Sequence, residues 1–205
     1  MVLHTRNFFF AFILTIFVSV LIFFATGQYG KNASFLVLNH DLGKAADRFF
    51  LVISWLGEGW LWLPVAAWLA WKKKKKLFLF AVVSFLVSTL FIQAGKRFVF
   101  PGEKRPYSAI ENKAMIHIVP QEKPHQLNSF PSGHTATAFT FYLFFSLVLG
   151  NWWVITGMVL ALGVGYARVY LAQHFPFDVA GGMLCAAMAA GISYLVTRKY
   201  LTKPE

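Results

Sequence analysis

Two histidines in polar, basic surroundings are the residues of this sequence best suited to chemistry. His174 precedes Asp178 by four residues, so the carboxylate can reach a ring nitrogen if the turn at Pro176 is helical. The carboxylate would fix the tautomer and leave the other nitrogen free as a nucleophile, as in catalytic triads. His134 is then available as the general acid for a leaving oxygen. The spacing predicts nucleophilic catalysis at a histidine.

The segment Phe130–His134 predicts an anion site. It reads Phe-Pro-Ser-Gly-His and opens a long apolar run. A helix is expected to begin at Pro131 or Ser132, because proline suits a first turn and serine suits a cap. The free amide groups at such an end attract phosphate, and Gly133 lets the backbone approach a ligand closely. The competing interpretation is an ordinary capped membrane helix with a histidine at the water interface.

Cations accompany both histidines. Polar clusters at 96–106, 132–134 and 168–178 come from the ends of predicted spans and fall on one membrane face. Arg168 and Asp178 are costly in lipid unless they are paired or face a wet cavity. Two histidines and a carboxylate could also hold iron or zinc, but the surrounding cations favour an anion instead. A purely structural ion-pair network, the other alternative, leaves the two histidines unexplained.

The composition is that of a membrane protein. The chain has 205 residues, 58% of them hydrophobic and 13% charged, with a mean hydropathy of +0.58. This length predicts one membrane-embedded domain over residues 1–205. The net charge of +11 does not predict nucleic-acid binding, because the basic residues lie between spans. Cys185 is the single cysteine, so no intrachain disulfide can form.

Apolar runs predict an all-α membrane protein, a six-helix bundle with its active site at one membrane face. A cleaved signal peptide is the alternative for the first run, but the run is long and Ala25-Thr26-Gly27 is a poor cleavage site. Residues 28–48 are expected to form a loop with a short helix, and Gly57 and Gly59 to mark where an interfacial helix gives way to the second span. The predicted spans are about 8–25, 51–71, 77–94, 132–149, 152–172 and 176–196.

Six spans place both termini on one side, together with the five lysines Lys72–Lys76. Lysines and arginines are almost equally numerous on the two sides, but this block directly abuts two span ends, where the positive-inside rule counts most. We therefore expect a multi-pass protein of a bacterial-type cytoplasmic membrane, with its termini in the cytoplasm and its site on the outer face.

These motifs resemble those of the type 2 phosphatidic acid phosphatase (PAP2) superfamily, whose members are mostly integral membrane lipid phosphatases. Pro131-Ser132-Gly133-His134 matches the family's second motif in full. The third motif matches in the spacing of Arg168, His174 and Asp178, although Ala167 replaces the family's serine.

The first motif is present as Lys96 and Arg105-Pro106, with eight residues between them where the family usually has six. Because of this difference, Arg97 and Lys104 stay open as alternatives for the lysine. The resemblance covers roughly residues 91–185 by motif and the whole chain by span layout.

The resemblance implies a metal-independent and cofactor-free mechanism. His174 would attack phosphorus and form a phosphohistidine, Asp178 would orient it, and His134 would protonate the departing lipid oxygen. The groups that would hold the phosphate oxygens are Lys96, Arg105, Ser132, Gly133 and Arg168.

The expected function is hydrolysis of a lipid phosphate, with undecaprenyl diphosphate the first choice of substrate and phosphatidylglycerol phosphate and phosphatidic acid next. Lipid A is an alternative substrate. A non-enzymatic anion transporter does not need the spacing of His174 and Asp178. A vanadate haloperoxidase shares the motifs, but those relatives are mostly soluble. The one expected partner is the lipid substrate; no nucleic acid or protein partner is evident.

Overall fold

The computed structural model describes residues 3–201, and the regular secondary structure within them is all helix, without a strand. The predicted all-α class is confirmed. The elements are α1 (Thr5–Tyr29), α2 (Lys31–Leu38), α3 (Lys44–Ser54), η1 (Trp55–Gly57), η2 (Gly59–Leu61), α4 (Trp62–Trp71), α5 (Lys75–Ala94), η3 (Gly95–Val99), α6 (Pro106–Ala109), η4 (Lys113–Met115), α7 (Gly133–Val148), α8 (Trp152–Tyr170) and α9 (Pro176–Leu201).

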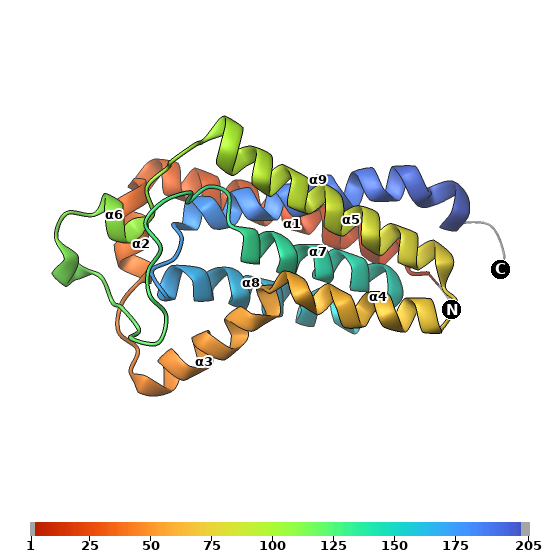
Figure 1. The fold of residues 1–205 in the computed structure, drawn as a ribbon, viewed down its shortest axis with the longest axis horizontal. Helices are drawn as coiled ribbons and strands as arrows, with labels where there is room; N and C mark the ends of the chain where they lie inside the picture. The colour runs from red at the N-terminus through yellow and green to blue at the C-terminus, as the bar shows by residue number, and fades with distance from the viewer. Residues whose placement is uncertain (1–2, 202–205) are drawn as a thin grey trace.

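The long helices form an elongated bundle around α7 (Figure 1). Helix α7 packs against α8, α9, α1 and α5, while α9 also packs along α5 and α1. The start of α1, the end of α9 and the turn between α4 and α5 share one end of the bundle, and α2, α6 and the long 95–130 loop gather at the other (Figure 1). The lysine-rich turn and the long loop therefore lie at opposite ends.

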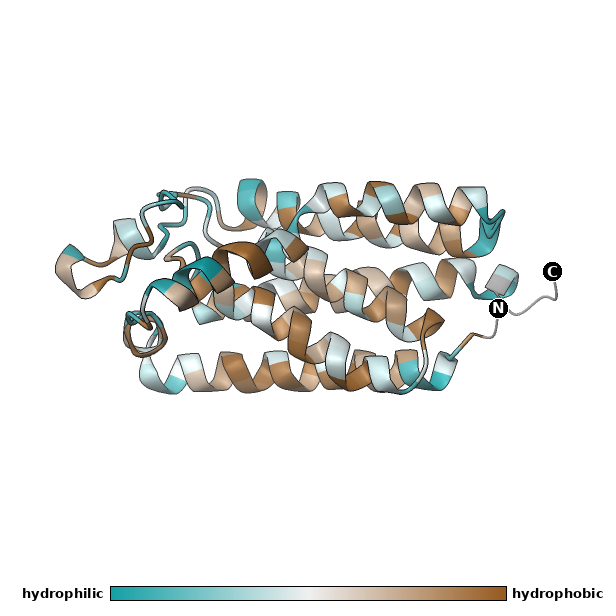
Figure 2. Cartoon of the chain, turned by 90° about the horizontal axis from the view of Figure 1, so that it is seen from below, coloured by the Kyte–Doolittle hydropathy of each residue, from teal (hydrophilic) through white to brown (hydrophobic). Residues whose placement is uncertain are grey.

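Several helices are long and apolar enough to cross a membrane. Four qualify alone: α1, α5 continued through η3, α8 and α9. A fifth span results if the bent pair 44–57 and 59–71 counts as one. Hydrophobic residues occur along the length of the helices, and hydrophilic residues gather at the turns (Figure 2). The chain is a multi-pass membrane protein.

Whether the protein has a sixth membrane span depends on helix α7. It has 16 residues, which corresponds to about 24 Å of helix, whereas a bilayer's hydrocarbon core is about 30 Å thick. Although a helix occupies each of the six predicted ranges, α7 is too short to qualify on its own. Six spans therefore stay a prediction.

The second predicted span is broken where the glycines suggested it would be. Glu58 has an extended backbone (φ −77°, ψ 131°) between the short helices η1 and η2, and the two halves bend by 55°. The predicted short helix within 28–48 is α2. Helix α3 starts at Lys44, earlier than the predicted span, because it packs one face along α8.

Close approach between α9 and the start of α7 fixes the polar end of the bundle. A Cβ atom at Gly182 would lie 2.5 Å from the Ser132 carbonyl oxygen, so a larger residue there would push the two segments apart. The Ser132 amide donates to the Asp178 carbonyl at 3.0 Å. The two motifs of highest interest are thus joined through their backbones.

Candidate active site

His174 and Asp178 meet at the start of α9. The helix begins at Pro176 and carries Asp178 in its first turn. His174 Nδ1 lies 3.4 Å from Asp178 Oδ2, and both side chains are almost completely buried. A histidine that shares Nδ1 with a carboxylate keeps Nε2 for other chemistry.

A set of contacts fixes the Asp178 carboxylate. Its Oδ2 accepts from the Phe175 amide at 2.9 Å and from the Ser129 hydroxyl. On its other side, Lys31 Nζ from α2 lies 3.8 Å from Oδ1 and forms an ion pair with Glu103. These contacts hold the carboxylate against His174.

His174 is held in its neutral form. Burial, followed by the charges of Arg105 and Lys96, keeps the pKa of His174 well below its usual range. A neutral imidazole has a free lone pair and can act as a nucleophile. The carboxylate of Asp178 is placed to stabilise a positive charge on this ring.

Arg168 lies next to His174 through the backbone. Its carbonyl oxygen accepts from the amides of Gln173 and His174 at 2.9 and 3.1 Å. Arg168 is 3% exposed, and one nitrogen of its guanidinium donates to the Ser54 hydroxyl at 2.6 Å. Two of its nitrogens also reach Glu122 Oε1 at 3.4 Å. The Glu122 carboxylate therefore occupies a fork suited to phosphate oxygens.

Arg105 clamps the long loop. Its guanidinium donates to the carbonyls of Leu127, at 2.9 Å, and Gln173, at 3.0 Å. Burial and the nearby charge of Arg168 lower the pKa of Arg105 to about 10. Arg105 thus stays charged at neutral pH, but several of its donors are bound to the protein itself.

Lys96 and Arg105 line a cavity of about 470 Å³ together with residues 125–128. Lys96 is half-buried in the π-helical turn η3 that ends α5. Both alternatives for its place in the motif, Arg97 and Lys104, are exposed. Of these three residues, Lys96 is therefore the one that lines a cavity together with Arg105.

The start of α7 has the predicted cap. Ser132 precedes the first residue, Gly133, and its hydroxyl accepts from the Thr135 amide at 3.4 Å and the Thr135 hydroxyl at 2.9 Å. The serine side chain is buried and occupied by capping. Gly133 is only half-buried, and the first-turn amides supply the positive end of the helix dipole. His134, in the same turn, places Nε2 3.0 Å from Glu58 Oε1.

Sequence reasoning missed several polar partners of the predicted residues. Two of these partners could have been found from the sequence, because Ser54 and Glu58 are the polar interruptions of the apolar stretch 49–71. Polar residues inside membrane spans are candidates for a functional role. The others lie in the polar segments, where nothing distinguishes them from their neighbours: Lys31, Glu103, Glu122, Ser129 and Gln173.

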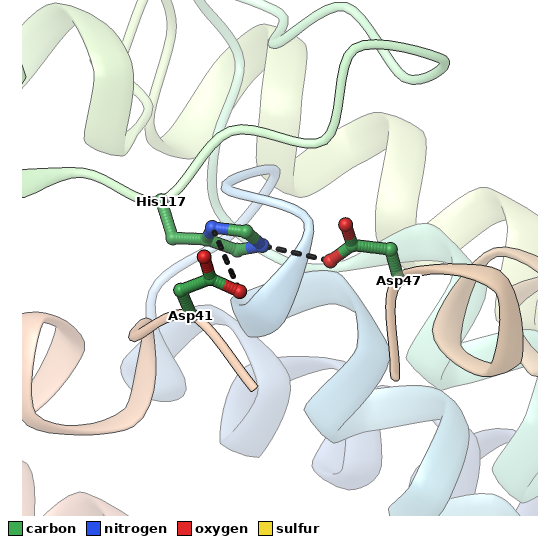
Figure 3. A group of neighbouring side chains, drawn as sticks. All are labelled: Asp41, Asp47 and His117. Atoms are coloured by element: carbon green, nitrogen blue, oxygen red, sulfur yellow. Dashed lines mark hydrogen bonds and ion pairs between the residues drawn. The ribbon is translucent and has the colours of Figure 1, made fainter. Parts of the chain in front are cut away.

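A separate cluster joins the long loop to the rest of the bundle. Figure 3 shows His117 between Asp41 and Asp47, which it reaches at 4.0 and 2.9 Å. Their ligand atoms lie within 4.8 Å of one another, close enough to consider a metal ion. Asp47 also accepts from the Tyr170 hydroxyl at 2.7 Å, and Asn39 donates to the His117 carbonyl at 3.2 Å. The cluster thus already has protein partners that tie the loop to α3 and α8.

Comparison with known proteins gives consistent results. The sequence profile of the PAP2 superfamily matches residues 76–201. An undecaprenyl-diphosphatase of Sulfolobus acidocaldarius is 26% identical over 171 residues, 83% of this chain and 78% of that protein. A lipid A 1-phosphatase of Rhizobium johnstonii is 26% identical over 181 residues, 88% of this chain and 61% of that protein.

A solved structure shares the fold. The crystal structure of Aquifex aeolicus LpxE superimposes with a TM-score of 0.69 at 27% sequence identity. The match covers 78% of this chain and 92% of that one. The similarity therefore extends beyond the motif region to most of the bundle.

Proposed function

Because the chain belongs to the PAP2 superfamily, we propose that it is a membrane lipid phosphatase that works through a phosphohistidine on His174. The observation that carries this proposal is the pair of His174 and Asp178, 3.4 Å apart and buried among cations. A neutral histidine with a carboxylate on one nitrogen is equipped to attack through the other. An anion-binding transporter has no use for such a pair.

The proposed reaction has two halves. In the first, His174 Nε2 forms a bond to phosphorus while the bond from phosphorus to the lipid oxygen breaks. The electron pair goes to that oxygen, which takes a proton from His134. In the second half, water attacks the phosphohistidine and His134 takes a proton from it. Free phosphate and neutral His174 result, and the Asp178 charge stabilises the positive ring in between.

The phosphate itself would be held by cations and amides. Arg168 offers a guanidinium fork that Glu122 occupies at 3.4 Å, and a phosphate with more charge can displace this carboxylate. Lys96 adds a point charge, and Gly133 presents its amide at the start of α7. We assign Arg105 a smaller part, because it donates to the carbonyls of Leu127 and Gln173. The Ser132 hydroxyl already caps α7.

Undecaprenyl diphosphate is the substrate that we propose first. The relative from Sulfolobus acidocaldarius carries that activity in its name, and the cavity beside Lys96 and Arg105, about 470 Å³, could admit a second phosphate group. Phosphatidylglycerol phosphate and phosphatidic acid come next. Lipid A is the second candidate, since the relative from Rhizobium johnstonii is named for it.

We further propose that the site faces the outside of a bacterial-type cytoplasmic membrane. The Lys72–Lys76 block lies at the end of the bundle opposite α2 and the long loop (Figure 1). Lys31 of α2 reaches Asp178 at 3.8 Å, so the site lies at the loop end. The positive-inside rule then places the lysines and both termini in the cytoplasm.

Phosphate release from a panel of purified lipids tests the function. Wild-type protein and His174→Ala would be compared in detergent on undecaprenyl diphosphate, lipid A, phosphatidylglycerol phosphate and phosphatidic acid. We expect release from at least one lipid by the wild type and none by the variant. Equal rates for both proteins would refute the assigned chemistry, and the ranking of lipids decides between the substrates.

A further inference from the structure

The second histidine of the site also faces a carboxylate, and it comes from a part of the chain outside the family match. Glu58 Oε1 lies 3.0 Å from His134 Nε2, whereas the superfamily profile begins at residue 76. The pair formed by His174 and Asp178 belongs to the motifs; the pair formed by His134 and Glu58 does not. Each histidine therefore has its own carboxylate partner.

The break in the second predicted span brings Glu58 close to His134. Its extended backbone separates η1 from η2, and the flanking halves bend by 55°. Gly57 permits the contact, because a Cβ atom there would lie 2.8 Å from both the Cβ and the carbonyl oxygen of His134. Ser54 lies four residues before Glu58, and its hydroxyl accepts a hydrogen bond from the Arg168 guanidinium at 2.6 Å. Residues 54–58, from the end of α3 to the break, thus contact two motif residues.

The electrostatics of the site give the carboxylate a task. Three cations, Arg168, Lys96 and Arg105, act on the His134 ring. A carboxylate within hydrogen-bond distance favours the charged ring and also fixes its orientation. The Glu58 side chain is 41% exposed, and the His134 ring is the partner it contacts at this distance.

We propose that Glu58 is a positioning residue that orients His134 for proton transfer. Its carboxylate accepts the Nε2–H, and Nδ1 carries the proton that moves. This role rests on the proposed phosphatase function. When the bond from phosphorus to the lipid oxygen breaks, the electron pair goes to that oxygen and the Nδ1 proton follows it. Nδ1 then takes a proton from the water that attacks the phosphohistidine, while the Nε2–H stays on the ring and keeps its hydrogen bond to Glu58.

Comparing substrates with different leaving groups distinguishes this positioning role of Glu58 from a purely structural one. An alkyl phosphate releases a strongly basic oxygen and needs an acid, whereas 4-nitrophenyl phosphate releases a stable anion and needs little help. Glu58→Gln keeps the shape but removes the charge. Since general acid catalysis supplies roughly 10²–10⁴-fold, we expect turnover of a long-chain alkyl phosphate to fall on the order of tenfold to a hundredfold. Turnover of the nitrophenyl ester should change little.

Further variants serve as controls for this measurement. Glu111→Gln removes an exposed carboxylate in the long loop and should leave both rates unchanged. His134→Ala should show the same dependence on the leaving group, and adding Glu58→Gln to it should cause no further loss, because the two residues act as a unit. Glu58→Asp keeps the charge at a shorter reach and should show the same pattern to a smaller degree, which covers the case that Glu58→Gln does not fold.

Equal losses on both esters, or losses that multiply with those of His134→Ala, would overturn the role of Glu58 and leave the phosphatase proposal standing. No phosphate release by the wild type from either ester would overturn the phosphatase proposal, and this inference with it.

Discussion

Asp178→Asn is the substitution whose effect can be worked out most fully from the structure. Asp178 Oδ2 accepts from the Phe175 amide at 2.9 Å and from the Ser129 hydroxyl. Both are donors, so the asparagine must place its own oxygen there and its NH₂ group on the other side. That side faces Lys31, 3.8 Å from Oδ1 in the wild type. His174 can still donate to the amide oxygen, so the substitution mainly removes the negative charge.

The expected loss in kcat follows from the loss of the negative charge of Asp178. His174 Nδ1 and Asp178 Oδ2 lie 3.4 Å apart, and opposite charges near 4 Å attract by about 4 kcal/mol at an effective dielectric constant of about 20. That attraction exists only once the ring becomes positive, so its loss lowers turnover rather than binding. At about 1.4 kcal/mol for each factor of ten, kcat should fall roughly a thousandfold.

Steady-state phosphate release from the preferred lipid measures both kcat and KM. Asp41→Asn is the matched control, because Asp41 is exposed and its oxygen accepts from the Gly43 amide at 2.7 Å, which an amide side chain can replace. We expect the control to keep kcat, and Asp178→Asn to lose it with KM nearly unchanged. A loss in kcat below about tenfold, or an effect confined to KM, would mean that Asp178 serves structure and not the chemistry of His174.

Further predictions follow from the same site. Burial and cations lower the pKa of His174 below 6.5, so the neutral nucleophile persists as the pH falls through that value; kcat/KM should hold at pH 6.5 and decline only below it, and an acid limb centred above 6.5 would contradict this. Activity should survive chelators and be inhibited by vanadate, because protein cations neutralise the phosphate; strict dependence on added divalent metal would count against the mechanism. A cysteine at Asn112 should react with an impermeant thiol reagent in intact cells and one at Lys74 only after lysis, with Cys185→Ser removing the buried native thiol; the reverse pattern would put the site in the cytoplasm.

The sequence contained most of the helical arrangement because apolar runs bounded by turns determine where helices begin and end in lipid. The runs before Lys72 and after Lys76 became α4 and α5, and Gly150-Asn151 became the turn between α7 and α8. The number of spans could not be derived in this way. Helix α7 is short and largely buried by its neighbours, so its apolar residues report protein packing as well as contact with lipid.

Local spacing was also sufficient to bring His174 and Asp178 together, because a helical turn fixes side chains four residues apart. Contacts between distant segments were not accessible. Lys31 reaches Asp178 across 147 residues of sequence, and it does so only because α2 packs against the start of α9. No periodicity encodes such a contact.

The long loop was the least predictable segment. Asn39 donates to the carbonyls of His117, Val169 and Tyr170 at 3.2, 3.1 and 2.7 Å, and accepts from the His117 amide at 2.9 Å. This buried amide satisfies backbone groups that a loop would otherwise leave unpaired. In the sequence, Asn39 is one polar residue among many, so its burial could not be anticipated.

Trapping the phosphohistidine on His174 tests the proposed reaction at its covalent step. Wild-type protein would be mixed with lipid labelled in the phosphate, quenched within the first turnover under alkaline conditions that preserve phosphohistidine, and analysed by peptide mapping. We expect label on His174, with none in His174→Ala and a longer-lived signal in His134→Ala, where water is activated less well. Label on His134 instead, or steady turnover with no labelled protein at any time, would contradict it.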